Sequence, residues 1–378
     1  MNKIEHLIQQ LCPEGVEYKS LGKVCDIRRG SSITKSAVTE GSIPVIAGGR
    51  TPAYFHNISN RIGETIVIAG SGAYAGFVSW WEQPIFVSDA FSIKSYDDLL
   101  TKFCFYWLKN MQQRLYDLKS GGGVPHVYPR DIEVLFIPIP PLEIQKEIVN
   151  ILDTFTQLEA ELEAELEARK KQYEYYRNSL LNFDGKEVEW KTIGDVGSVK
   201  MCKRIMKHET SNVGDIPFFK IGTFGKTPDA FISSQLFEEY KKKYNYPLKG
   251  EVLISAAGTI GRTVIYNGEP AYFQDSNIVW LSNNETKVTN KFLYYYYKII
   301  KWETEGGTIP RLYNDNILRT KIPIPPLSEQ ERIVAILDKF DALVNDISVG
   351  LPAEIAARKK QYEYYREKLL TFKEKPNA

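Results

Sequence analysis

Basic and polar side chains gather at matching places in the two halves of this chain. Arg28, Arg29 and Ser31 directly follow a short β-type run in the first half. The equivalent place in the second half is also basic and holds Lys200, Lys203, Arg204 and Lys207. Guanidinium, ammonium and hydroxyl groups interleaved with tyrosine and amide side chains can position phosphates and contact the edges of bases. These two places are therefore candidate polyanion-binding surfaces.

Further cations extend the two candidate surfaces: Arg50, Lys220, Lys226 and Arg262. Each of these side chains alone is more often a solvated surface cation, and the net charge of +1 argues weakly against a nucleic-acid partner. The charge is nevertheless uneven. Residues 1–136 carry +1 and residues 184–321 carry +4, whereas residues 137–183 carry −4 and residues 322–378 carry 0. Any polyanion surface should therefore lie on residues 1–136 or residues 184–321.

Patterns typical of catalysis are missing. The four histidines are isolated, with no HxxxH or HExxH spacing and no Ser-His-Asp or Cys-His order. The glycine-rich residues 70–76 read GxGxxxG without a Walker lysine, which favours a turn at a strand edge over a nucleotide loop. There is no Asn-Pro-Pro-aromatic loop of the kind found in amino-methyltransferases. We expect no catalytic residue in this chain.

Two further patterns could hold a metal ion. Glu17-Tyr18-Lys19 and Glu189-Trp190-Lys191 are E-x-K triplets, which some nucleases use, but no acidic partner on a matching strand precedes either one. A solvated strand face is the better interpretation. The four cysteines are widely spaced, with no CxxC, and indicate idle or buried thiols in a reducing compartment: Cys12, Cys25, Cys104 and Cys202. We expect no metal site.

The elements that must position these residues occur twice. The hexapeptide IPIPPL at Ile137–Leu142 recurs letter for letter at Ile322–Leu327. The decapeptide ARKKQYEYYR at Ala168–Arg177 recurs at Ala357–Arg366. The period of roughly 185 residues is far longer than the 20–50 residues of a solenoid repeat. The chain is therefore a duplicated module made of a domain and a helix.

Weaker matches extend the duplication. Residues 17–24 pair with residues 189–196, and residues 121–128 pair with residues 306–313. Between these anchors the two copies differ greatly. The frame of the module is thus shared, whereas the surface between the anchors is not.

Each large module is predicted to be mixed α/β with many short strands. Short β-branched and aromatic runs bounded by Gly, Pro or Asn indicate strands at Thr65–Ala69, Ile85–Val87, Glu251–Ser255 and Asn277–Leu281. Length and spacing indicate helices at Phe103–Leu115 and Lys291–Trp302.

A long helix is predicted to follow the first hexapeptide. No Gly or Pro occurs from Leu142 to Gly185, and apolar residues recur at steps of three and four. About 40 residues at 1.5 Å each give a helix of roughly 60 Å. Such a helix needs a partner, and the helix after Leu327 is the obvious one, which predicts an antiparallel coiled-coil pair.

The two helical copies differ in two ways. Residues 158–168 of the first copy read LEAELEAELEA, with Glu165→Arg169 and Glu167→Lys171 as favourable i,i+4 pairs. The second copy is four residues longer over the matching stretch and contains Gly350-Leu351-Pro352. This tripeptide should kink or break the second helix.

The duplicated decapeptides have two interpretations. They could form the core of the helix pair, or they could be two identical docking faces, because tyrosine and arginine are favoured at interfaces. The docking interpretation is preferred, and the two overlap. The candidate partner-binding residues are Arg169, Lys170, Tyr173, Tyr176, Arg177, Arg358, Lys359, Tyr362, Tyr365 and Arg366.

These repeats together resemble the specificity (S) subunits of type I restriction-modification systems. The resemblance covers nearly the whole length and rests above all on IPIPPL, a following Gln, and a long helix with RKKQYEYYR, seen twice. The LEAE run is similar to the short repeats of the family's central helix. The resemblance implies two target recognition domains, residues 1–136 and 184–321, and two conserved elbow-and-helix regions, residues 137–183 and 322–378.

The family resemblance also implies partners. Each target recognition domain would bind one half of a bipartite, asymmetric sequence in double-stranded DNA. Two methyltransferase (M) subunits would dock on the conserved helices, and restriction (R) subunits would join them. The expected cofactors S-adenosylmethionine, ATP and Mg²⁺ would belong to those partners and not to this chain.

Two alternatives stay open. The chain could be a scaffold without DNA, in which a coiled coil carries two variable ligand-binding modules. It could also be a single-chain restriction-methylation enzyme, although the missing methyltransferase domain speaks against this. The N-terminal residues lack an apolar core of a signal peptide, and the uncharged run from Thr65 to Trp81 is too short and glycine-rich to cross a membrane. We expect a cytoplasmic protein without a membrane partner.

Overall fold

The computed structural model describes residues 2–121, 123–306 and 310–376, which group into two units. Unit 1 consists of Met1–Ala164 and Glu354–Ala378, and unit 2 consists of Glu165–Ala353. The repeated strings at 121–128 and 306–313 are covered only in part, because residues 122 and 307–309 lie outside the described residues.

Two sheets and a two-stranded ribbon form the module of unit 1. The larger sheet has the strand order β2-β8-β5-β6 and is antiparallel throughout, and the smaller sheet has the order β4-β3-β7. Strand β3 pairs antiparallel with β4 but parallel with β7. The strands are β1 (Glu17–Ser20), β2 (Cys25–Arg29), β3 (Ile43–Ile46), β4 (Tyr54–His56), β5 (Thr65–Ala69), β6 (Val78–Trp81), β7 (Phe86–Val87), β8 (Ala90–Ser95) and β9 (Phe136–Ile139).

The module of unit 2 has the same topology. Its larger sheet has the order β11-β17-β14-β15, and its smaller sheet has the order β13-β12-β16 with the one parallel pair between β12 and β16. The strands are β10 (Glu189–Thr192), β11 (Gly197–Met201), β12 (Ile216–Phe219), β13 (Phe231–Ile232), β14 (Val252–Ser255), β15 (Thr263–Ile265), β16 (Tyr272–Phe273), β17 (Ile278–Asn283) and β18 (Lys321–Ile324). The predicted duplication and the mixed α/β class are thus confirmed.

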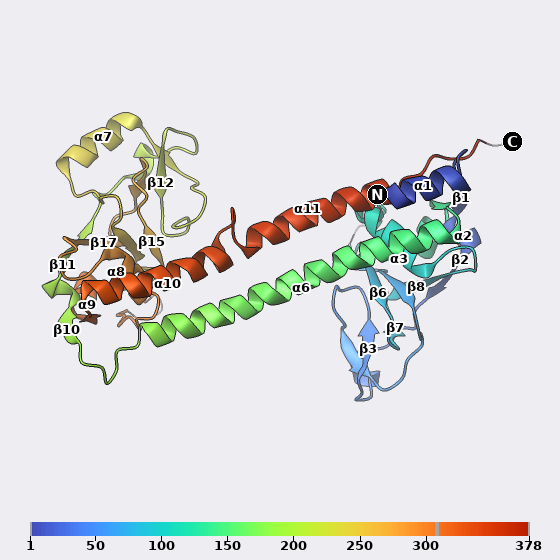
Figure 1. Cartoon of the computed structure of the whole chain (residues 1–378), viewed down its shortest axis with the longest axis horizontal. Coiled ribbons are helices and arrows are strands. Elements are labelled where there is room, and N and C mark those ends of the chain that lie inside the picture. The colour runs from blue at the N-terminus through green and yellow to red at the C-terminus, as the bar shows by residue number, and fades with distance from the viewer. Residues whose placement is uncertain (1, 122, 307–309, 377–378) are drawn as a thin grey trace. The chain divides into compact units, whose positions relative to one another are not determined.

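Helices complete both units (Figure 1). Those of unit 1 are α1 (Asn2–Leu11), α2 (Leu21–Val24), η1 (Lys35–Ala37), α3 (Thr101–Asn110), α4 (Gln112–Asp117), α5 (Pro129–Glu133) and α11 (Leu351–Leu370), of which α11 begins in unit 2. Those of unit 2 are η2 (Ile193–Asp195), η3 (Lys207–Glu209), α7 (Ser234–Lys243), α8 (Asn290–Tyr297), α9 (Asn314–Arg319) and α10 (Leu327–Asn345). The helix α6 (Leu142–Leu180) belongs to both units.

The proline hexapeptides form strands as well as turns. Ile137 to Ile139 lie in β9 and pair with β1, and Ile322 to Ile324 lie in β18 and pair with β10. Proline is tolerated in these two-stranded ribbons because an edge strand does not need every N–H. The division between residues 136 and 137 that the sequence suggests therefore falls inside β9.

The predicted long helix is confirmed as α6, with 39 residues. In unit 1 its apolar side is fully buried at Ile144, Ile148 and Leu152. Further along, Phe155 stacks on Tyr365 of α11 with ring centroids 5.6 Å apart. These contacts explain why a helix this long is stable, since its apolar stripe is covered by other parts of the chain.

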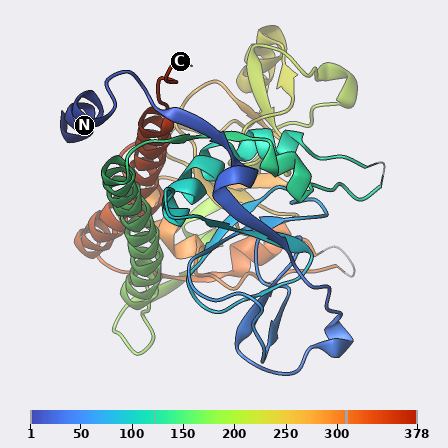
Figure 2. The same cartoon turned by 90° about the vertical axis from the view of Figure 1, so that its right-hand side faces the viewer.

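Helices α6 and α11 run antiparallel within unit 1. Phe155 of α6 contacts Tyr365 and Tyr362, while Glu159 and Glu163 bind Lys359 at 3.2 and 2.8 Å. Residue numbers therefore rise along α6 as they fall along α11. Figures 1 and 2 show the two helices side by side.

The second helical copy is broken, as predicted from Gly350-Leu351-Pro352. Helix α10 ends at Asn345, and α11 begins at Leu351. Pro352 lies in the first turn of α11, where its missing N–H costs nothing. A Cβ on Gly350 would lie 2.4 Å from the carbonyl oxygen of Ala342, so only glycine lets the chain pass there.

Each module is attached to its long helix by a tyrosine and a lysine that share one aspartate. In unit 1, Tyr106 of α3 donates a hydrogen bond to Asp153 of α6, and Lys102 lies 3.6 Å from the same carboxylate. Unit 2 repeats this contact between α8 and α10. There the Tyr295 hydroxyl donates to Asp338 at 2.7 Å, and Lys291 lies 2.5 Å from it.

Three local predictions were wrong. The helix expected at Phe103–Leu115 is interrupted at Met111, which separates α3 from α4. The helix expected at Lys291–Trp302 ends at Tyr297, because the chain turns so that Trp302 packs against Tyr297, with centroids 5.5 Å apart. The expected pair of Glu167 with Lys171 is replaced by Glu167 with Lys170 at 2.9 Å, whereas the Glu165–Arg169 pair is confirmed at 2.7 Å.

No helix within the described residues is long and apolar enough to cross a membrane.

Candidate nucleic-acid interface

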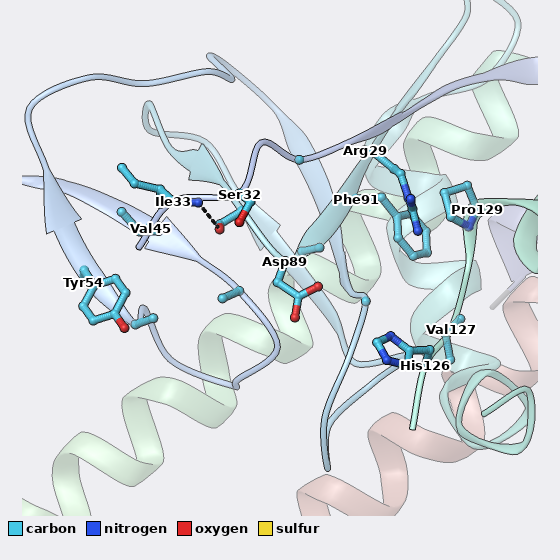
Figure 3. Close-up of a pocket in the computed structure, with 16 residues that line it drawn as sticks. Arg29, Ser32, Ile33, Val45, Tyr54, Asp89, Phe91, His126, Val127 and Pro129 are labelled. Carbon is cyan, nitrogen blue, oxygen red and sulfur yellow. Dashed lines mark hydrogen bonds between the residues drawn. The ribbon is translucent and has the colours of Figure 1, made fainter. Parts of the chain in front are cut away.

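A polar pocket lies where the two sheets of the first module meet. Its volume is about 440 Å³, and it is bordered by the end of β2, by β3 and β4, and by the turn between β7 and β8. Figure 3 shows its lining, with Asp89 in the middle of the side chains drawn. The polar side chains of the lining are Arg29, Ser32, Tyr54, Ser88, Asp89 and His126. We call it the first seam pocket.

One glycine shapes the first seam pocket. The chain leaves β2 at Gly30 and passes directly over the turn after β7. A Cβ at Gly30 would lie 2.1 Å from the carbonyl oxygen of Ser88. Any other residue would therefore push Arg29 and the following serines away from the turn that carries Asp89.

The second module has a pocket at the corresponding place. Its volume is about 590 Å³, and it lies between the end of β11, the strand β12 and the turn between β16 and β17. Its polar lining residues are Arg204, Lys207, Thr210, Asn212, Lys220, Gln274, Asp275, Ser276, Asn277 and Arg311. This second seam pocket is richer in basic and amide side chains than the first.

Backbone hydrogen bonds establish which residues correspond. After β5, Gly70 N donates to Asp89 O, and Val127 N donates to Gly70 O, at 3.1 and 3.0 Å. After β14, Ala256 N donates to Asn277 O, and Leu312 N donates to Ala256 O, at 2.7 and 2.9 Å. His126 and Arg311, one residue earlier, therefore occupy the same place in the two pockets.

Counted from the parallel strand pair, the two aspartates occupy equivalent positions, although the carbonyl that accepts from Gly70 or Ala256 belongs to Asp89 in the first module and to Asn277 in the second. Asp89 stands two residues after β7 ends at Val87, and Asp275 stands two residues after β16 ends at Phe273. The second module then inserts Ser276 and Asn277 before its next strand, with Ser276 in the left-handed region at φ 53°. Both modules thus carry a carboxylate at the base of the seam.

The carboxylates have different neighbours. Asp89 is exposed, and among the described residues its side-chain partner is the Ser71 hydroxyl rather than a cation. Asp275 is mostly covered, with 17% of its side chain exposed, and accepts a hydrogen bond from Nε of Arg204 at 2.9 Å. The Arg204 side chain is 66% exposed, so its outer N–H groups face solvent.

Arg311 is held from the other side of the second seam pocket. One of its terminal nitrogens donates to the Ser276 carbonyl and hydroxyl and to the Asn277 side chain, at 2.9 to 3.1 Å. Its counterpart His126 stacks on Tyr128 with ring centroids 5.8 Å apart. The inserted pair of residues thus fixes a guanidinium where the first module has an imidazole.

The predicted DNA-binding residues divide between the pockets and the surrounding surface. Arg29 lines the first seam pocket, and Arg204, Lys207 and Lys220 line the second. Lys220 is also paired with Asp229 at 2.8 Å. The structure therefore brings four of the eleven candidates together in equivalent cavities.

The other seven candidates lie outside the seam pockets. Ser31 stands two residues after Arg29, and its N–H donates to Val87 O at 2.9 Å. Arg262 donates to the Phe224 carbonyl at 2.9 Å, so it has a structural contact. Surface positions are held by Arg28 on β2, Arg50 stacked over Tyr74 at 4.7 Å, Lys200 on β11, Lys203 over Tyr244 at 5.2 Å, and Lys226 in an exposed turn.

Arg28 belongs to a basic surface that sequence reasoning missed. It lines a cavity of about 340 Å³ together with Arg61 and Lys94, and it is paired with Asp26 at 2.7 Å. Burial, with the nearby charge of Arg28, lowers the pKa of Arg61.

Asp89, His126, Asp275 and Arg311 were also missed as site residues. A partial signal existed, because His126 and Arg311 lie at matching positions of the repeated strings 121–128 and 306–313. The aspartates gave no signal, since their shared position depends on how the strands pair. Isolated acidic residues in a candidate polyanion site would ordinarily be dismissed.

The E-x-K triplets form ion pairs within each triplet. Glu17 lies 3.2 Å from Lys19 on β1, and Glu189 lies 3.0 Å from Lys191 on β10. Across residues 2–121, 123–306 and 310–376, no group of three or more His, Cys, Asp or Glu side chains could hold a metal ion. The four cysteines are buried and free of disulfides.

The candidate partner-binding residues lie partly in helix-pair contacts. Tyr173 is buried and donates a hydrogen bond to Asp341 at 3.2 Å, and Tyr176 stacks on Phe340. In unit 1, Tyr362 and Tyr365 contact Phe155. The cations remain at least partly accessible along α6 and α11: Arg169, Lys170, Arg177, Arg358, Lys359 and Arg366.

The middle tyrosine of each decapeptide points outward. Tyr175 is 69% exposed, and its repeat equivalent Tyr364 is 61% exposed. Each packs edge-on against the following tyrosine, with centroids 5.5 and 5.3 Å apart. The same aromatic surface is therefore presented on both helices, although these two residues were not among the candidates.

Fold and site together define a class of protein: a duplicated α/β protein whose two equivalent frames carry differently lined polar pockets. Comparison with known proteins gives the family. A family model described as type I restriction modification DNA specificity domain matches residues 13–168 and again residues 185–357. The chain belongs to this family, the specificity subunits of type I restriction-modification systems.

Individual relatives agree with this assignment. The chain is 48% identical over 374 residues to the Haemophilus influenzae protein named as type I restriction enzyme specificity subunit S.HindORF215P, covering 94% of this chain and 96% of that one. The crystal structure of the S subunit from M. genitalium matches with a TM-score of 0.63 and 19% identity, covering 96% of this chain and 97% of that chain.

A second solved structure shares the fold. Its description concerns complex assembly and conformational transition of the type I restriction-modification system. It matches with a TM-score of 0.58 and 20% identity, covering 94% of this chain and 97% of that chain.

Proposed function

We propose that this chain is the DNA-recognition subunit of a type I restriction-modification complex. It would read a bipartite, asymmetric sequence in double-stranded DNA, with one half-site for each module. The observation that carries this proposal is the seam pocket. Both modules place it at the same point of the same strand frame, yet line it with different polar side chains. Equivalent frames with different linings suit two different targets.

The chemistry would come from partner subunits. Two methyltransferase subunits would dock on the duplicated helical faces, and restriction subunits would join them. Support comes from the ten identical residues and from the outward tyrosines Tyr175 and Tyr364. Exposed aromatic side chains beside arginines are typical of protein interfaces.

S-adenosylmethionine, ATP and Mg²⁺ would be held by those partners. Apart from the two E-x-K triplets, whose glutamate and lysine pair with each other, the sequence contains none of the catalytic motifs considered above, as a non-catalytic subunit requires. We place the complex in the cytoplasm with the DNA on which it would act. A scaffold without DNA, the alternative raised from the sequence, has no observation in its favour.

Stoichiometry tests the partner assignment. Sedimentation velocity of the chain co-expressed with its methyltransferase should give two methyltransferase subunits per chain. Tyr175→Ala and Tyr364→Ala should each weaken one of the two docking events, and the double variant should weaken both. Tyr96→Ala is the matched control, because Tyr96 is 55% exposed but lies on the first module. A 1:1 complex with the unaltered chain would contradict two-site docking.

Binding tests the DNA assignment. The complex should bind double-stranded DNA carrying its target more tightly than other DNA, typically by 10³ to 10⁷ for specific proteins at physiological salt. The affinity should fall steeply with salt, because phosphate contacts release counterions. Equal affinity for all sequences, or none for DNA, would contradict the proposal.

A further inference from the structure

The two seam aspartates are unusual side chains for a surface that meets DNA. A carboxylate repels phosphates, so it weakens binding wherever the protein contacts the backbone. Yet Asp89 and Asp275 each stand two residues after the parallel strand of their module, in pockets that otherwise hold cations. A carboxylate is compatible with DNA where it meets a base edge, because it accepts hydrogen bonds from exocyclic amino groups.

We propose that Asp89 and Asp275 are specificity-determining residues of their half-sites, and that they act in two different ways. This inference rests on the function proposed above and assigns roles within it. Asp89 would accept a hydrogen bond directly from an amino group of a base. Asp275 would instead orient Arg204, which then contacts a guanine.

The direct role of Asp89 follows from its surroundings. Its side chain is exposed, lies in the middle of the pocket, and has a hydroxyl as its partner within the described part of the chain (Figure 3). A hydroxyl leaves the negative charge and most lone pairs of the carboxylate available. In the major groove only cytosine N4 and adenine N6 present amino groups. One position of the first half-site should therefore be C or A on the contacted strand.

The positioning role of Asp275 follows from its bond to Arg204. Asp275 is mostly covered and holds Nε of Arg204, whose outer N–H groups remain exposed. A guanidinium held at Nε keeps its two terminal nitrogens free as a planar fork. That fork matches the O6 and N7 acceptors of guanine. One position of the second half-site should therefore be G.

The difference between the modules is local. In the first pocket Arg29 lies over Tyr128 at 5.8 Å and does not pair with Asp89. In the second pocket the inserted Ser276 and Asn277 bind Arg311, so that this cation is occupied while Arg204 binds the carboxylate. The same aspartate is thus an acceptor in one module and an orienting group in the other.

Methylation mapping tests the proposal. The chain is expressed with its methyltransferase subunit in a host without other adenine methylation, and methylated sites are mapped across the genome. Asp89→Asn turns one acceptor oxygen into an amide donor, so the base preference at one position of one half-site should change by about 5- to 150-fold, the range expected for a base contact. The other half-site and the spacer should stay unchanged.

The second module gets a paired test. Asp275→Asn and Arg204→Lys should both relax the same guanine position of the other half-site by a similar factor. Arg204→Lys keeps the charge but removes the fork, so affinity for DNA lacking the target should hardly change. Asp275→Asn should not lower that non-specific affinity either. Relaxation at different positions by these two variants would overturn the positioning role.

Control variants separate recognition from charge. Glu64→Gln and Glu269→Gln each remove one exposed carboxylate of the same module outside the seam, and both should leave the mapped sequence unchanged. If Asp89→Asn lowers methylation at all sites alike, or changes no position, the role of Asp89 is wrong. If the unaltered complex yields no bipartite motif, the proposed function itself fails.

Folding of the variants is checked independently. Among the described residues, the side-chain hydrogen bond of Asp89 is with Ser71, so Asp89→Asn should keep the melting temperature of the complex. If a variant loses all methylation but keeps the melting temperature of the unaltered complex, its affinity is measured for a set of DNA duplexes, each altered at one position of the target. Recovered binding to a duplex altered at a single position supports the base contact. Recovered binding to none of the duplexes contradicts it.

Discussion

Gln145 and Gln330 make the same three hydrogen bonds in the two halves of the chain. Each follows its proline hexapeptide, and each is fully buried. Nε2 of Gln145 donates to the carbonyl oxygens of Asp98 and Pro140 at 2.9 and 2.7 Å, and Oε1 accepts from Leu100 N at 2.8 Å. One amide thus joins the module, the hexapeptide and the long helix.

The second copy repeats the contact almost distance for distance. Nε2 of Gln330 donates to the carbonyl oxygens of Lys287 and Pro325, and Oε1 accepts from Thr289 N, all at 2.8 Å. All three bonds fix how the module meets its helix. These hydrogen bonds therefore explain why a Gln follows IPIPPL in both copies.

Gln330→Leu should destabilise unit 2 severely. It leaves one N–H and two carbonyl oxygens buried without a partner, at about 1–3 kcal/mol each. We expect a loss of at least about 3 kcal/mol in urea unfolding, and early proteolysis near residues 287–289. Gln157→Leu is the control, because Gln157 is exposed and bonds only to its helix neighbour Glu161. Equal midpoints for the two variants would disprove this role of Gln330.

Alkaline pH should weaken the contact between Tyr295 and Asp338. Burial, together with the bond to this carboxylate, raises the pKa of Tyr295 far above its ordinary value. The unfolded chain then loses the tyrosine proton first, at about pH 10. The stability from this contact is therefore present below about pH 10 and falls as the pH rises further.

Tyr295→Phe isolates this effect. The variant should lose about 1.5–3 kcal/mol at neutral pH, the usual value of a hydrogen bond to a charged group. It should also lose stability less steeply than the unaltered chain above about pH 10. Tyr364→Phe is the control, since its side chain is 61% exposed. Parallel pH profiles for the unaltered chain and Tyr295→Phe would argue against this account.

The salt dependence of DNA binding should separate Arg28 from Arg262. Arg28 is exposed beside Arg61 and Lys94, so Arg28→Ala should reduce the salt slope by about one unit for every sequence. Arg262 donates to the Phe224 carbonyl, so Arg262→Ala should mainly lower the melting temperature. Salt titrations of the complex by fluorescence anisotropy measure the slopes. An unchanged salt slope for Arg28→Ala would show that Arg28 does not contact DNA phosphates.

Much of the frame could be predicted from the sequence. The exact repeats predicted two modules, and the absence of Gly and Pro after Leu142 predicted a long helix. The tripeptide Gly350-Leu351-Pro352 predicted a broken second helix. The structure shows all three features. Periodicity and repetition are properties of the sequence itself, so they can be recognised without knowledge of tertiary contacts.

The seam pockets could not be predicted in the same way. Arg29 and Arg204 stood out as basic residues, but Asp89 and Asp275 line the same pockets only because a parallel strand pair brings the following turn near the end of β2 or β11. Likewise, the helix that the decapeptide forms was predictable, but not which tyrosine is covered. Phe340 packs on Tyr173 and helps to bury it, whereas Tyr175 is exposed.

The LEAE run of α6 offers a test of the spacer between the half-sites. Units 1 and 2 divide within this run, between Ala164 and Glu165. Duplicating Leu162–Glu165 adds about 6 Å and about 40° of rotation to the helix. The rotation is close to the roughly 34–36° of one DNA base pair. We therefore predict a spacer longer by one base pair and unchanged half-sites.

A two-residue insertion at the same place provides the contrast. It rotates the helix by about 200° and should abolish recognition rather than lengthen the spacer. Methylation mapping of both variants measures the outcome. An unchanged spacer after the four-residue insertion would show that α6 does not set this distance.

Exchange of one module tests the central claim, that each module reads one half-site, most directly. Residues 17–139 are replaced by the corresponding segment of another family member, so that the β1–β9 ribbon stays intact. Methylated sites are then mapped for the unaltered and the exchanged chain. We predict that one half-site changes completely, while the second half-site and the spacer stay the same. A change in both half-sites, or in neither, would contradict the account.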